Sequence, residues 1–126
     1  MDITPLIKPG QQIIQNYSPG GFKISGKTFN SPVMVSAGRA EKWSVPDDLE
    51  KLSDEHIEIL SDMASDKDVL LLGTGKEIFF LSRMQKNAFR EKLGLSPEIM
   101  TTGAACRTYN VLISEHRRVL AAMLPE

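Results

Sequence analysis

The stretch from Met100 to Ile113 holds the residues best suited to chemistry, because small and polar side chains stand where a helix should begin. Thr102 is expected to cap this helix, since a threonine hydroxyl accepts hydrogen bonds from the free amides of a first turn. Cys106, the only cysteine of the chain, then falls just inside that turn. The helix dipole and the neighbouring Arg107 favour a thiolate there, which would make Cys106 a nucleophile or a redox-sensing thiol.

The opposite interpretation is that Cys106 is a small buried packing residue. On a helical wheel it lies at the edge of the apolar face, and Asn110 lies one turn further along at the rim. A nucleophilic cysteine usually needs a histidine base. The chain has His56 and His116, and spacing brings neither to Cys106, since His116 follows about 15 Å further along the same helix. Free cysteines are among the most buried residue types, so the packing role is favoured.

A second segment that could hold a ligand is Gly73-Thr74-Gly75-Lys76, which follows an apolar run at 68–73. Ligands gather at the carboxyl ends of strands in open α/β sheets, and Lys76 could meet an anion there. The segment matches no phosphate-binding motif, so a plain tight turn is the favoured interpretation. A small-molecule site between this turn and the helix start requires that the two segments be adjacent and that Cys106 be partly exposed.

Composition is typical of a soluble globular protein, and we expect a single domain over residues 1–126. Residues 1–10 contain two prolines and a glycine, which favours an arm over the surface. The 15 basic and 16 acidic residues nearly cancel, which argues against a nucleic-acid-binding face. One cysteine forms no internal disulfide, and no apolar run approaches the roughly 20 residues that span a bilayer. With no signal or transit pattern at the N-terminus, a cytoplasmic location is expected.

Two patterns of secondary structure follow one another along the chain. Short alternating runs separated by turns predict an antiparallel meander of strands at 12–17, 22–25, 27–29, 32–36 and 42–45. Helices and strands then alternate. We expect helices at 53–64, 82–93 and from Gly103 to near His116, strands at 68–73, 98–100 and 117–124, and an extended segment at 77–81. The fold class is therefore α/β: one three-layer domain with a mixed central sheet, helices packed on it and an N-terminal antiparallel β part.

Local signals define the ends of two of these helices. Ser53 is a cap for the first, in which His56 lies on the apolar side and is interpreted as a core-edge histidine bonded to a backbone carbonyl. Ser82 and Gln85 fit a capping box, and Gly94 is a natural left-handed terminator. The segment 117–124 is predicted to be a strand, although its alanines and leucines leave a C-terminal helix open.

The segments 17–22, 70–75 and above all 100–112, together with the ending 115–125, carry a resemblance to a known family. In them the chain resembles the small bacterial and archaeal proteins of unknown function related to mitochondrial respiratory complex I assembly factor 3. The resemblance covers nearly the whole chain. It implies a three-layer α/β domain with a mixed central sheet, no established enzymatic activity and no known cofactor.

Two functions from different classes follow. The resemblance implies a non-catalytic assembly factor whose partner is a protein client, such as a respiratory or membrane-complex subunit. No targeting leader like that of the mitochondrial relatives is seen, so a bacterial cytoplasm is expected; no metal is expected, and the oligomeric state stays open. The alternative is a small-molecule-binding protein or enzyme. The residues at matching positions, candidates for binding without catalytic roles, are Gly73, Thr74, Gly75, Thr102, Cys106, Thr108 and Asn110.

Overall fold

Two sheets and several helices alternate along the chain in the computed structural model, which describes residues 2–3 and 10–126. In chain order the elements are β1 (Ile14–Ser18), β2 (Gly21–Ile24), β3 (Lys27–Phe29), β4 (Val33–Val35), β5 (Ala40–Lys42), the 3-10 helix η1 (Leu49–Lys51), α1 (Asp54–Glu58), α2 (Ser61–Ala64), β6 (Val69–Gly73), α3 (Arg83–Leu93), β7 (Pro97–Met100), α4 (Thr102–Ser114) and β8 (Val119–Met123). Most of the predicted arm, residues 1 and 4–9, lies outside the described residues. Asp2 and Ile3 pair with β1.

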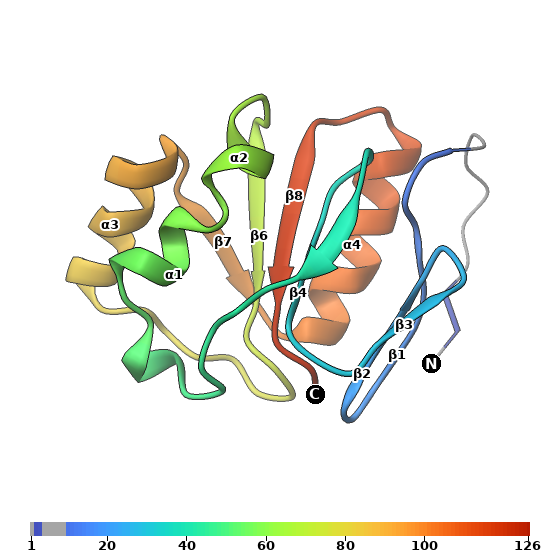
Figure 1. Ribbon diagram of the computed structural model, residues 1–126, viewed down its shortest axis with the longest axis horizontal. Helices are drawn as coiled ribbons and strands as arrows, with labels where there is room; N and C mark the ends of the chain where they lie inside the picture. The colour runs from blue at the N-terminus through green and yellow to red at the C-terminus, as the bar shows by residue number, and fades with distance from the viewer. Residues whose placement is uncertain (1, 4–9) are drawn as a thin grey trace.

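A five-stranded mixed sheet is the middle of three layers (Figure 1). Its strand order is β5-β4-β8-β6-β7, with β6 parallel to both β7 and β8 and with β4 antiparallel to its neighbours. Helices α1, α2 and α3 cover one face. Helix α4 and the antiparallel sheet β1-β2-β3 cover the other. The predicted three-layer α/β fold with an N-terminal antiparallel part is confirmed.

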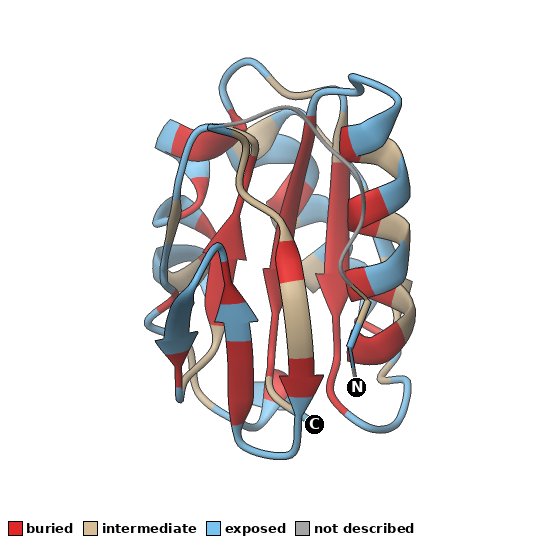
Figure 2. Ribbon diagram, turned by 90° about the vertical axis from the view of Figure 1, so that its right-hand side faces the viewer, coloured by how far each residue is buried: buried red, intermediate tan, exposed pale blue. Residues whose placement is uncertain are grey.

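The two faces of the sheet explain why the central strands are apolar without alternation. In β6, Leu70 and Leu72 pack under α1–α3, whereas Leu71 packs against α4. Strand β8 divides in the same way, with Leu120 on the first face and Ala121 on the second. Every residue of β8 is buried, as is every residue of β6 after Val69, and the central strands are accordingly mostly red in Figure 2. A strand covered on both faces needs apolar side chains at every position, which is the pattern that predicted it.

The predicted helix at 53–64 is wrong in one respect, because it is broken into α1 and α2. The indole Nε1 of Trp43 donates to the carbonyl of His56 at 3.0 Å. An uninterrupted helix would give this carbonyl to the amide of Leu60, which instead donates to Ile57 at 3.0 Å. The ring of His56 also differs from its prediction, since Nδ1 accepts from the backbone N–H of Ser53 at 3.0 Å and completes a capping box.

One predicted strand is misplaced, and the segment 77–81 lies outside the sheets. The last strand of the meander is at 40–42 rather than 42–45, because Trp43 turns into the core and is fully buried. The segment 77–81 belongs to no strand or helix. Its backbone is held by Thr74, whose hydroxyl donates to the carbonyl of Glu77 at 2.8 Å and accepts from the amide of Phe79 at 3.0 Å. None of the described helices is long and apolar enough to cross a bilayer.

Candidate functional site

The turn after β6 and the start of α4 lie side by side, as a ligand site between them would require. The amide of Thr102 donates to the carbonyl of Gly75 at 2.9 Å. The amide of Gly75 donates to the hydroxyl of Thr102 at 2.8 Å, and that hydroxyl donates to the carbonyl of Leu124 at 2.5 Å. The fully buried Thr102 therefore joins the ends of β6 and β8 to the first turn of α4.

This junction is closely packed around Gly73. A Cβ placed on Gly73 would lie 2.9 Å from Cγ of Met123 and 3.1 Å from Cα of Thr102. Glycine is therefore needed here for the close approach of strand and helix. Gly75 has a φ of 102° and forms the turn itself, in agreement with the favoured interpretation of this segment.

The cap of α4 is Thr101 and not the predicted Thr102. The side chain of Thr101 accepts from the amide of Ala104 at 3.4 Å. Both residues are good caps by type, and the contacts of Thr102 with Gly75 and Leu124 draw its hydroxyl into the interior instead.

Cys106 is 0% exposed, which supports the favoured packing interpretation and argues against the alternative of a thiolate or a redox-sensing thiol. Its Sγ lies 3.7 Å from Sδ of Met123. Burial raises the pKa of the Cys106 thiol to about 12, against a weaker opposing effect of Arg107. The hypothesis of a small-molecule site beside α4 required Cys106 to be partly exposed. The burial of Cys106 removes this support for the hypothesis.

We expect alkaline pH to destabilise the protein through Cys106. A thiol whose pKa is raised in the folded state, from 9.0 to about 12, contributes stability that is complete below about pH 9 and is lost as the pH rises to about 12. By pH 10.5 the loss should be about 2 kcal/mol. Urea unfolding across this range measures it, and Cys106→Ala should show a smaller loss. An equal loss in both proteins would assign the effect to other groups, such as Tyr109, whose pKa burial also raises.

Asn110 is buried rather than at the rim, because β1 lies over it. Its Oδ1 accepts from the amide of Ile14 at 3.1 Å, and its Nδ2 donates to the carbonyls of Ile14 at 2.8 Å and Ile3 at 3.2 Å. Thr108 is half-buried on the same helix. The binding of a ligand or a partner by the seven candidate residues stays a prediction.

An exposed apolar surface that sequence reasoning missed lies at the segment 78–84. Ile78, Phe80 and Met84 are 45%, 72% and 81% exposed. Met84 also borders a groove of about 470 Å³ between α1 and α3, whose apolar lining includes Leu52 and Ile57. The signal was present as the apolar run at 77–81, which was interpreted as an extended segment of the fold.

The comparisons with known proteins agree with this fold. The family model described as "Protein of unknown function (DUF498/DUF598)" matches residues 14–124. An uncharacterised protein of Rhodobacter capsulatus is 38% identical over 112 residues, which cover 89% of this chain and 83% of that protein. The NADH dehydrogenase [ubiquinone] 1 alpha subcomplex assembly factor 3 of Danio rerio is 33% identical over 115 residues, which cover 90% of this chain and 64% of that protein.

A solved structure supports the same conclusion about the fold. The crystal structure of a protein from Bordetella parapertussis matches with a TM-score of 0.81 and 27% identity, covering 93% of this chain and 98% of that one. The layers described above are therefore shared by a relative of known structure.

Proposed function

This chain belongs to the DUF498/DUF598 family of proteins of unknown function, and on that premise we propose that it is a non-catalytic factor that binds a client protein during the assembly of a larger complex. The similarity to assembly factor 3 of Danio rerio supports a function of this kind. A cytoplasmic location and a respiratory or membrane-complex subunit as the client belong to the same proposal.

The exposure of Phe80 and Met84 is the observation that carries this proposal. Single exposed apolar residues are ordinary, but three fall within the short segment 78–84, and the last of them, Met84, borders an apolar groove; exposed apolar surface concentrated in this way supports an interaction site. Large aromatic and methionine side chains are enriched at the centres of protein interfaces. Phe80 faces solvent between Phe79 and Leu81, which both pack against the core.

The charges of the groove indicate the chemistry of the client segment. Asp54 and Glu55 are exposed and line the groove beside Met84 and Leu52. An apolar segment flanked by lysine or arginine would place its apolar side chains on the groove floor and its cations beside these carboxylates. We therefore propose a basic amphipathic segment of the client as the occupant.

Complementation tests the proposal. Danio rerio cells that lack assembly factor 3 would receive this chain behind a mitochondrial targeting leader, and assembled NADH dehydrogenase would be measured on native gels. We expect the chain to restore assembly and Phe80→Asp to restore little of it, because an interface-centre aromatic contributes about tenfold or more to affinity. The substitution should change unfolding stability by less than about 0.5 kcal/mol, since Phe80 is mostly exposed.

The matched control is Val111→Asp, which places the same charge on an exposed apolar residue of α4, on the other side of the sheet. This variant should restore assembly like the unmodified chain. A photo-crosslinking residue at position 80 should capture a subunit of NADH dehydrogenase, and one at position 111 should not. Failure of the unmodified, correctly imported chain to restore assembly or to crosslink would contradict the proposal, and a loss confined to Val111→Asp would move the interface to α4.

A further inference from the structure

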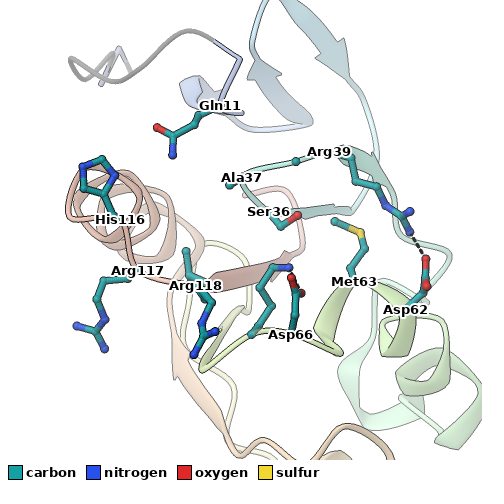
Figure 3. A pocket seen from close by; sticks show the side chains of 13 residues that line it. Gln11, Ser36, Ala37, Arg39, Asp62, Met63, Asp66, His116, Arg117 and Arg118 are labelled. Carbon is teal, nitrogen blue, oxygen red and sulfur yellow. Dashed lines mark hydrogen bonds and ion pairs between the residues drawn. The ribbon is translucent and has the colours of Figure 1, made fainter.

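A separate polar cleft lies at the opposite end of the central sheet from Gly73, where β6 and β8 begin (Figure 3). Its volume is about 440 Å³, within the range of small-molecule sites. Its walls come from four places: the segment before β1, the turn between β4 and β5, the end of α2 with the residues after it, and the turn from α4 into β8. None of the residues predicted to bind a ligand lies in this cleft.

The lining of this cleft has an excess of positive charge. In Figure 3 Arg39 forms one wall, held by its ion pair with Asp62 at 2.8 Å, while Arg117 is turned outward. Carboxylates outside the lining also pair with two of its cations, Glu41 with Arg39 at 2.7 Å and Asp68 with Arg118 at 3.0 Å, so the attraction for an anion rests mainly on Lys67. The lining contains four basic residues and two acidic ones. The basic residues are Arg39, Lys67, Arg117 and Arg118, and the acidic residues are Asp62 and Asp66.

Lys67 is the cation best placed to meet an anion inside the cleft. Its side chain is only 13% exposed, although ammonium groups are usually left in water. Nζ contacts the carboxylate of Asp66, which itself is mostly exposed. An ammonium has three N–H donors, so this single contact leaves donors available to a ligand.

Two further polar groups of the cleft lack hydrogen-bond partners. Ser36 is 4% exposed, and its hydroxyl forms no hydrogen bond with any residue that the structure describes. Oε1 of Gln11 is buried and likewise has no partner in the described part of the chain. Buried polar groups in folded proteins are nearly always paired, so the orphaned Oε1 of Gln11 in the same cleft as a covered ammonium indicates a missing ligand.

We propose that this cleft binds a small anion that carries hydroxyl groups, of the sugar-phosphate or hydroxycarboxylate class. The anionic group accepts from the ammonium of Lys67 and from the hydroxyl of Ser36. A ligand hydroxyl donates to Oε1 of Gln11, which an anion bound through Lys67 alone would leave unpaired. This site is distinct from the surface at 78–84 and does not depend on the client-binding function.

Titration of the isotope-labelled protein, followed by amide chemical shifts, tests the site with glycerol 3-phosphate, citrate, inorganic phosphate and neutral glycerol. We expect glycerol 3-phosphate or citrate to shift amides at 36–39 and 117–119 saturably, inorganic phosphate to bind more weakly, and glycerol to have no effect. Lys67→Met should weaken binding about tenfold, and Gln11→Leu should reduce the affinity for glycerol 3-phosphate to that for phosphate. Lys76→Met is the matched control and should bind normally.

Three results would overturn the proposal: no saturable shift with any probe below about 10 mM, unchanged affinity in Lys67→Met, or shifts clustered around Lys76 instead of the cleft. Ser36→Ala provides an independent variant of the same site if Lys67→Met melts at a lower temperature than the unmodified chain. A separate experiment measures binding to phosphatidylglycerol vesicles. If the protein binds these vesicles but not free glycerol 3-phosphate, the cleft recognises a lipid headgroup, and the proposal of a free small-molecule ligand is overturned.

Discussion

Replacement of Asn110 by leucine should destabilise the protein by about 3–5 kcal/mol, the largest effect that we expect from one substitution. The leucine fills a similar volume but bonds neither to the amide nor to the carbonyl of Ile14, both of which Asn110 now satisfies. Each buried group left without a partner costs about 1–3 kcal/mol, and the bond to Ile3 is lost as well. Urea unfolding measures the change, and amide exchange at Ile14 should accelerate because β1 loses its attachment to α4.

The control for this substitution is Thr108→Ala on the same helix. Thr108 is half-buried and its hydroxyl bonds to no described residue, so the change should be within about 0.5 kcal/mol. A cost below about 1 kcal/mol for Asn110→Leu, or unchanged exchange at Ile14, would show that the attachment of β1 depends on apolar packing alone.

Features that depend on neighbouring residues could be predicted from the sequence. Helix α3 is the clearest case, because its limits are set locally. The Ser82 hydroxyl accepts from the amide of Gln85 at 3.1 Å, the Gln85 side chain accepts from the amide of Ser82 at 3.0 Å, and Gly94 ends the helix with a φ of 71°. The central strand β6 was predictable for a different reason, since burial on both faces leaves an unbroken apolar run.

The candidate site depends on contacts between distant parts of the chain, and there the sequence was less informative. Asn110 meets a strand 96 residues earlier, and no spacing within α4 reveals that partner. A helical wheel places Cys106 at the edge of the apolar face, because the wheel assumes that only one side of the helix is covered. Here a second sheet covers the same helix, so a residue at the edge of the wheel is in the core.

Thr102 gives the second large effect, because its hydroxyl makes two buried hydrogen bonds across the carboxyl end of the sheet. We expect Thr102→Val to cost about 2–4 kcal/mol, since valine keeps the shape but leaves the amide of Gly75 and the carbonyl of Leu124 unpaired. Thr102→Ser, which keeps the hydroxyl, should cost less. Thr101→Ala removes only the helix cap and should cost about 1 kcal/mol.

The order of these three variants distinguishes a junction residue from a helix cap. If Thr102 acts by joining β6, β8 and α4, amide exchange at Gly75 should accelerate in Thr102→Val and stay unchanged in Thr101→Ala, with unfolding costs in the order given above. Equal costs for Thr101→Ala and Thr102→Val, with Gly75 unaffected, would contradict this role and return Thr102 to the capping role that its position in the sequence first indicated.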